Sequence, residues 1–362
     1  MKIDLYLWGH MKLYAFMFVV LFALELLYFY IANKCNIIDK PNERSSHSSV
    51  VLRGGGIIFA LALLVWVLIF GVYWNNWSIV LGYLPFLSGL FLVTVVSFWD
   101  DIRPLPDKVR LCAHIIAMVL MFYNWGVLRF EFWYILLAAL IVCVGMINVY
   151  NFMDGINGIT GGYSLVVLCS LVILNSPRYF HIEINGYNEF MRYSYLGAVV
   201  VAVVVFCLFN FRSKGKAKCF AGDVGSVSIA YMILFPLGKL LQCTGDFTYM
   251  VILVVYGVDA CLTIVHRIML HENLGQAHRK HAYQIMANEL KMGHVKVSFI
   301  YMAMQAVISF VFIFIVPNDH LSHWIYLISV LLILTLAYVI FMKKYYHLHE
   351  EYLKSLSSNV KQ

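Results

Sequence analysis

The stretch LGYLPFLSGLFLVTVVSFWDD, residues 81–101, decides the fold class, because it is a long apolar run that ends in two adjacent carboxylates. A helix that crosses a bilayer needs about 20 predominantly apolar residues. The segments 295–316 and 323–342 are apolar runs of the same kind. We therefore expect an all-α membrane protein that carries acidic side chains at the ends of its helices.

The composition supports this class. Of 362 residues, 62% are hydrophobic and 12% are charged, whereas a soluble domain carries about 25% charged residues. The eight cysteines form no CxxC pair and are interpreted as small hydrophobic residues. Residues 13–32 are too long for a signal-peptide core and predict an uncleaved anchor. Membrane lipids are the expected surroundings, and no nucleic-acid partner is expected.

Eleven spans are predicted in one polytopic helical bundle. Of the 26 Lys and Arg residues, 20 fall in segments that follow odd-numbered spans, which places those segments in the cytoplasm, the N-terminus outside and the C-terminus inside. We expect one membrane domain, 1–342, with cytoplasmic loops 33–53, 100–110, 151–157, 212–222 and 269–294, and a cytoplasmic tail, 343–362. The spans lie at about 12–32, 54–73, 79–99, 109–124, 132–150, 158–175, 193–211, 223–240, 248–268, 295–316 and 323–342.

The first two loops carry charges suited to phosphate. Arg44, His47 and Arg53 form a cationic rim before three glycines, 54–56, which would let backbone amides approach a ligand. In the second loop, Asp100 and Asp101 can bind Mg²⁺ through water, or one of them can accept a proton from a substrate. Nearby Lys108 and Arg110 would complement an anion. The alternative for both loops is ordinary solvated charge at helix ends.

The next two segments combine amides, glycines and acids. Asn148, Asn151, Asp154 and Asn157 are interleaved with glycine, and such segments at membrane depth normally line a cavity because lipid cannot satisfy them. In the fourth, Asp223 begins a span between two glycines after a basic loop. It is either a helix N-cap or a carboxylate that binds a metal beside phosphate-binding cations.

The last loop contains His278, Arg279 and His281, a compact cluster of donors for phosphate or a nucleotide. Zinc binding is the less favoured alternative, because no nearby Cys or Glu completes a tetrahedral set. The remaining histidines have no comparable context, and we expect them at the surface: His294, His320, His323, His347 and His349.

Taken together, residues 39–284 resemble the polyprenyl-phosphate N-acetylhexosamine-1-phosphate transferase family. The resemblance rests on Asp-Asp after a span, Asn-x-x-Asn-x-x-Asp-Gly at 148–155, and Phe-Ala-Gly-Asp-Val-Gly-Ser at 220–226. It implies a cytoplasmic active site in a bacterial inner membrane and dependence on Mg²⁺, with Mn²⁺ as a substitute. It further implies transfer of a sugar-1-phosphate from a UDP-N-acetylhexosamine to undecaprenyl phosphate with release of UMP, and it is compatible with a homodimer.

The resemblance also implies roles for individual residues. Asp223 matches a metal-binding carboxylate, and Asn151 matches a neighbouring contact to metal or diphosphate. Asp100, Asp101 and Asp154 are the expected catalytic acids. The expected substrate-binding residues are Arg44, His47, Arg53, Arg110, Asn148, Asn157, His278, Arg279 and His281.

Two differences from the usual family motifs indicate which branch the chain resembles. Asp154-Gly-Ile-Asn157-Gly stands where many members have a second Asp, and Tyr283-Gln284 stands where several continue with histidines. The pattern is more similar to the branch that starts O-antigen, some of whose members handle deoxy-amino sugars. A cation-coupled secondary transporter is the alternative function, although transporters usually place coupling residues near the midplane and show internal symmetry.

Overall fold

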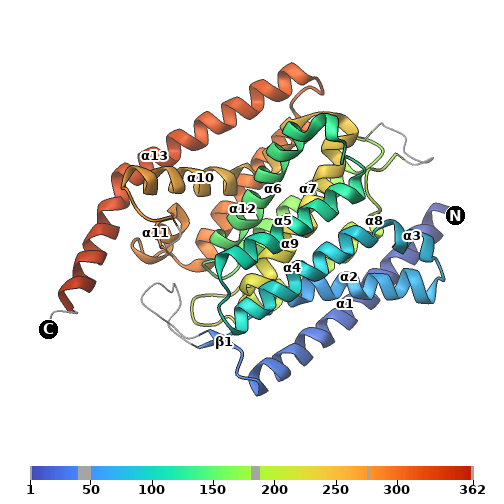
Figure 1. Cartoon of the computed structure of the whole chain (residues 1–362), viewed down its shortest axis with the longest axis horizontal. Helices are drawn as coiled ribbons and strands as arrows, with labels where there is room; N and C mark the ends of the chain where they lie inside the picture. Colours follow the sequence, from blue (N-terminus) through green and yellow to red (C-terminus); the bar gives the residue numbers. More distant parts are fainter. Residues whose placement is uncertain (1, 40–49, 181–187, 275–277, 360–362) are drawn as a thin grey trace.

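The computed structural model describes residues 2–39, 50–180, 188–274 and 278–359. Within them the chain is a bundle of helices with one two-stranded antiparallel sheet, in which Ile38 pairs with Leu52 and Asp39 with Val51 (Figure 1). The elements in chain order are α1 (Lys2–Lys34), β1 (Ile38–Asp39), β2 (Val51–Leu52), α2 (Ile57–Val67), the π-helical η1 (Leu68–Tyr73), α3 (Trp77–Gly82), α4 (Leu84–Ile102), α5 (Asp107–Trp125), η2 (Phe130–Phe132), α6 (Trp133–Met153), α7 (Ile159–Leu174), α8 (Tyr193–Asn210), α9 (Gly222–Thr244), η3 (Phe247–Leu253), α10 (Val254–Met269), α11 (Ala282–Asn288), α12 (His294–Phe314) and α13 (His320–Asn359).

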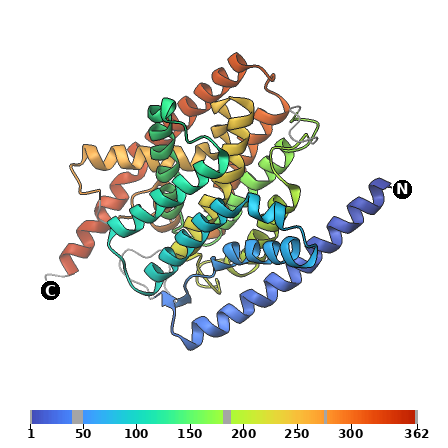
Figure 2. The same cartoon turned by 45° about the vertical axis from the view of Figure 1, so that its right-hand side comes forward.

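Each of the eleven predicted spans falls on helix. Within the described residues, eight helical segments are long and apolar enough to cross a membrane. Two more are shorter apolar helices, 57–73 and 159–174, and α5 is not among either group. The chain is therefore a polytopic all-α membrane protein, while the count of eleven crossings and the orientation of the termini stay predictions. The two termini lie at opposite ends of the molecule (Figures 1 and 2).

Helix α9 forms the centre of the bundle. Its apolar window is 83% buried, against 22% for α6 and for α13, which lie at the periphery. It packs on α4, α6, α2 and α7, and α1 runs along one side of the assembly (Figure 2). The helices α4 and α6 end where α5 and α9 begin, so four helix ends meet at one end of the bundle.

Several predicted boundaries were wrong. The acids at 100–101 lie inside α4, so the predicted loop 100–110 shrinks to 103–106. Helix α6 includes the first three residues of the predicted loop 151–157. The predicted span 79–99 is broken between α3 and α4, and the loop 269–294 contains α11. Helix α13 continues through residue 359, so the part of the predicted tail that the structure describes is helical. Hydropathy does not predict where these helices begin and end, because the helices extend beyond the apolar runs.

The glycines at 54–56 contact the chain's own backbone. Gly55 N donates to Phe220 O at 2.9 Å, and Gly56 N donates to Ala221 O at 3.1 Å. A Cβ on Gly56 would lie 2.2 Å from the Gly225 Cα. We expected these glycines to approach a ligand, but among the described residues their close approach serves to dock the loop against the start of α9.

Candidate functional site

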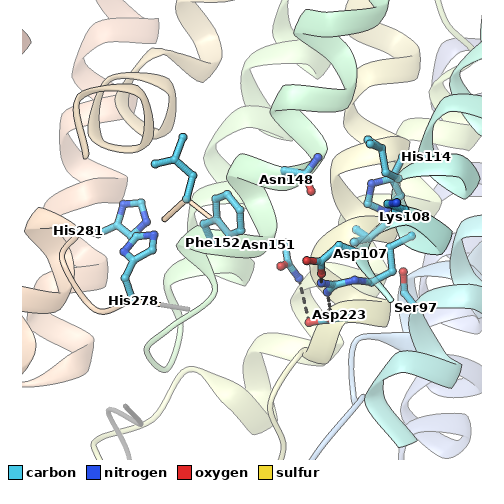
Figure 3. A pocket seen from close by; sticks show the side chains of 14 residues that line it. Ser97, Asp107, Lys108, His114, Asn148, Asn151, Phe152, Asp223, His278 and His281 are labelled. Atoms are coloured by element: carbon cyan, nitrogen blue, oxygen red, sulfur yellow. Dashed lines mark hydrogen bonds and ion pairs between the residues drawn. The ribbon is translucent and has the colours of Figure 1, made fainter. Parts of the chain in front are cut away.

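A cavity of ≈ 490 Å³ opens where the four helix ends meet. Figure 3 shows Asp223, Asn151 and Ser97 on one side of it, with His278 and His281 on the other. Its lining comes from α4, α5, α6, α9 and the segment around α11. The lining residues are Ser97, Asp107, Lys108, Arg110, Leu111, His114, Asn148, Asn151, Phe152, Asp223, Val227, Leu274, His278 and His281.

Asp223 is the focus of the polar contacts in this cavity. It lies in the first turn of α9, where a helix favours negative charge. Asn151 Nδ2 donates to Asp223 Oδ1 at 2.9 Å, and Arg110 Nη1 lies 3.3 Å from Asp223 Oδ2. Arg53 Nη2 lies 3.7 Å from Asp223 Oδ1. Residues from three distant parts of the sequence therefore converge on the carboxylate of Asp223, and all four are residues that the sequence proposes for the site.

The two acids of α4, Asp100 and Asp101, make their polar contacts with other groups of the same chain. Asp101 accepts from the backbone N–H groups of Asp223 (2.9 Å) and Val224 (3.0 Å), and its Oδ1 lies 2.7 Å from Arg53 Nε. Asp100 accepts from Leu105 N at 2.5 Å and from Arg110 at 3.1 Å. Neither acid lines the cavity. Their geometry makes them the frame that holds Asp223 and the two arginines.

The segment after α6 divides into cavity residues and scaffold residues. Asn148 and Asn151 line the cavity. Asp154 instead accepts from Thr160 Oγ1 at 2.5 Å, and burial raises the pKa of its carboxyl to about 7 although that hydrogen bond lowers it. Asn157 donates to Arg212 O (2.9 Å) and Ser213 O (3.2 Å), outside the cavity. Asn157 therefore connects its own loop to the loop at 212–213, and it does not line the cavity where a substrate contact was expected.

The histidine loop, residues 278–281, contributes two of its three predicted residues. His278 and His281 line the cavity. Burial, with the neighbouring His281 and Arg267, lowers the pKa of His278 to about 3, so it is a neutral hydrogen-bonding group near pH 7. His281 Nδ1 lies 3.4 Å from the buried Asp259, which also accepts from Ala282 N at 3.1 Å. Asp259 was not among the residues expected at the site.

Arg279 is directed elsewhere. Its Nη2 donates to Glu289 Oε1 at 2.9 Å, and its guanidinium lies 4.3 Å from the ring centroid of Tyr352. His349 Nδ1 lies 3.0 Å from the same Glu289 oxygen. Arg279 is therefore used to fasten the histidine loop to the C-terminal part of α13, and it is not among the cavity-lining residues.

Three histidines expected at the surface are buried. His294, His323 and His349 are 1%, 4% and 2% exposed. Each contacts a polar group that lies far away in the sequence, such as Asp246 for His323, at 2.6 Å. Sequence context alone does not reveal such partners. Two other predicted residues, Arg44 and His47, lie outside the described part of the chain.

Some cavity residues had no assigned role in the sequence analysis, namely Ser97, His114, Phe152 and Val227. Three of them could have been found from the sequence, because they lie four residues from a predicted site residue on the same helix. Ser97 precedes Asp101 by four residues, His114 follows Arg110 by four, and Val227 follows Asp223 by four, so each shares a helix face with a predicted site residue.

The donor set fits a magnesium ion that is shared with a substrate. No group of three or more His, Cys, Asp or Glu side chains in the described residues is arranged to hold a metal. Asp223 and Asn151 nevertheless present carboxylate and amide oxygens at the cavity, and Mg²⁺ in proteins is usually held by one or two carboxylates together with water and substrate phosphates. The site therefore fits a metal that the protein holds only in part.

Comparison with known proteins shows a similarity to one family over part of the chain. The sequence model of glycosyl transferase family 4 matches residues 83–237, from the end of α3 into α9, and this segment carries Asp100, Asp101, Arg110, Asn151 and Asp223. Over these residues the chain is similar to that family. The chain is also similar to the probable undecaprenyl-phosphate N-acetylglucosaminyl 1-phosphate transferase of Bacillus subtilis (strain 168), with 24% identity over 70% of each sequence.

Two further similar proteins carry the name undecaprenyl-phosphate alpha-N-acetylglucosaminyl 1-phosphate transferase. The protein of Escherichia coli (strain K12) is 24% identical over 62% of this chain and 61% of its own length. The protein of Salmonella typhi is 26% identical over 59% of this chain and 57% of its own length. The matched region thus spans less than two thirds of these two relatives.

Proposed function

We propose that this chain transfers an N-acetylhexosamine-1-phosphate, GlcNAc or a related deoxy-amino sugar, from a UDP-sugar to undecaprenyl phosphate and releases UMP. The observation that carries the proposal is the convergence of Arg53, Arg110 and Asn151 on Asp223, a carboxylate that lines the cavity. The names of the similar proteins support the same reaction class and the acceptor. The product would start a lipid-linked surface glycan such as O-antigen, at the cytoplasmic face of the bacterial inner membrane.

The reaction needs alignment and neutralisation of charge. An oxygen of the lipid phosphate attacks the β-phosphorus of the UDP-sugar, a new P–O bond forms, and the bond from that phosphorus to the bridging oxygen breaks. The bridging oxygen leaves with UMP. Both partners are anionic, so positioning and electrostatic stabilisation are the main contributions of such an enzyme. Arg53 and Arg110 are placed to bind phosphate oxygens beside Asp223.

The local charge supports a metal requirement. Around Asp223 the described side chains include four carboxylates (Asp100, Asp101, Asp107 and Asp223) and three cations (Arg53, Lys108 and Arg110). Without a further cation, two phosphate-bearing substrates would meet a site of net negative charge. Mg²⁺ held by Asp223 and Asn151 would supply charge stabilisation for the departing UMP.

The test is UMP release by detergent-purified protein with undecaprenyl phosphate, Mg²⁺ and a panel of UDP-N-acetylhexosamines. We expect release that depends on the lipid and on one preferred sugar, and loss of at least 100-fold in rate in Asp223→Asn. Glu131→Gln, an exposed change on η2 remote from the cavity, is the matched control. Absence of release with every sugar from folded protein contradicts the proposal.

The same preparation separates two further questions. A covalent aspartyl-phosphate route would exchange labelled UMP into the UDP-sugar without lipid, whereas direct attack requires the acceptor. For the transporter alternative, activity would depend on an ion gradient in vesicles and not on chelatable metal. Light scattering of the same preparation tests the expected homodimer.

A further inference from the structure

The cavity has a second level of side chains, one helical turn deeper in the bundle than Asp223. We call the level of Asp223 the first level. Helices α4 and α6 end at the site, so their deeper residues come earlier in the sequence than their first-level residues. Helices α5 and α9 begin there, so their deeper residues come later. One turn corresponds to about 5.4 Å along a helix. Each helix contributes one such cavity-lining residue: Ser97, His114, Asn148 and Val227.

This deeper level differs in character from the first one. It carries no carboxylate, Lys or Arg, and Val227 adds apolar wall. His114 is its distinctive member. The side chain lines the cavity (Figure 3), is only 5% exposed, and its Nδ1 has no hydrogen-bond partner in the described part of the chain. An unpartnered buried ring nitrogen is costly, and this one lies in a cavity wall where a ligand could satisfy it.

The two substrates of the proposed reaction reach the cavity from different sides. A UDP-sugar is water-soluble and enters from the aqueous end, where the histidine loop and the arginines lie. A polyprenyl phosphate is anchored in the bilayer, so its phosphate and first isoprene unit reach the cavity from the membrane side. The deeper level combines hydrogen-bonding groups with apolar wall, which matches the junction between a phosphate and a hydrocarbon chain.

We propose that His114 is a binding residue for the phosphate end of the lipid acceptor. In this assignment, which rests on the proposed function, an imidazole N–H donates to a non-attacking phosphate oxygen. Asn148 and Ser97 lie at the same level. Val227 then contacts the first isoprene unit. The donor diphosphate occupies the first level, around Asp223 and the arginines.

Two-substrate kinetics test this proposal. In His114→Phe, which keeps a ring but removes its hydrogen-bonding nitrogens, we expect the KM for undecaprenyl phosphate to rise about tenfold, the scale of one lost hydrogen bond to a charged group. The KM for the UDP-sugar should change less than twofold. His114→Gln keeps an N–H donor and should recover most of the acceptor affinity. His347→Phe, at an exposed position on α13, is the matched control.

Direct binding separates this proposal from the proposed function. Native mass spectrometry with undecaprenyl phosphate and with undecaprenol, in wild type and His114→Phe, should show that the variant loses the preference for the phosphorylated lipid. A rise in donor KM instead, or an unchanged acceptor KM with unchanged lipid binding, overturns the role of His114 while wild-type turnover still stands. Wild-type protein that binds the lipid phosphate but turns over no UDP-sugar defeats the proposed function alone.

Discussion

Asp101 caps the helix that presents Asp223. The Asp101 carboxylate accepts from the Asp223 backbone N–H at 2.9 Å and from the next N–H at 3.0 Å, and it also holds the guanidinium of Arg53. Residues 122 positions apart therefore form one unit in which the first acid sets the position of the second. The adjacent acids of α4 and the single acid of α9 thus have different tasks.

Substitution of Asp101 should weaken both stability and activity. In Asp101→Asn an amide N–H₂ faces backbone N–H donors, and Arg53 loses a buried charge partner. We expect a loss of about 1–3 kcal/mol in the free energy of unfolding and at least a tenfold lower rate. Thermal unfolding and UMP release measure the two. Asp223→Asn should instead lose activity with little change in Tm. If Asp101→Asn lost activity at unchanged Tm, Asp101 would act in the chemistry.

The contact between the glycines of α2 and α9 predicts a steric effect. Gly56→Ala would place a Cβ 2.2 Å from the Gly225 Cα, so the loop that carries Arg53 must move. We expect destabilisation of at least about 1–3 kcal/mol and loss of folded protein on size-exclusion chromatography. Gly82→Ala meets no atom within 4 Å and should behave as wild type. Equal behaviour of the two variants would contradict this packing.

Asp154 predicts a pH dependence of stability. Burial raises the pKa of its carboxyl from 3.8 to about 7, so the folded state keeps a proton that the unfolded chain has lost. The associated stability is complete below about pH 4 and declines as pH rises to about 7. In Asp154→Asn, Tm should therefore fall less than in wild type between pH 5 and 8. Parallel Tm curves for the two proteins would exclude a protonated Asp154.

The contact between the C-terminal part of α13 and the histidine loop predicts an effect on the donor. Tyr352→Ala removes the ring under Arg279, and His349→Ala removes a partner of Glu289. Both should let the histidine loop move and raise the KM for the UDP-sugar several-fold, with a smaller effect on kcat. His347→Ala, at an exposed position on the same helix, is the control. An unchanged donor KM with faster hydrogen exchange of residues 278–289 would show that the loop does not bind the donor.

Metal removal tests the charge argument. In the proposed site one carboxylate and one amide would hold the ion only in part, so we expect EDTA to abolish turnover and millimolar Mg²⁺ or Mn²⁺ to restore it. Asn151→Ala should raise the metal concentration that gives half-maximal rate by about tenfold. Activity that persists in EDTA after dialysis would remove the metal from the proposed site.

The amino-acid sequence by itself determined the membrane class and the helical segments, and it predicted residues that the structure brings together. Apolar runs of spanning length directly indicate helices that are buried in the membrane. Acids and amides at the ends of such runs cost free energy near the hydrocarbon core, so their presence indicates a function. For this reason Asp223, Asn151, Arg53 and Arg110 were predicted and are found together. The tertiary structure decided which polar groups face the cavity. Arg279 and Asn157 have partners far away in the sequence, and Asp100 and Asp101 frame the site. The contact of Asp259 with His281 became visible only in the folded structure, because hydrogen-bond partners in a folded bundle depend on distances that no sequence spacing specifies.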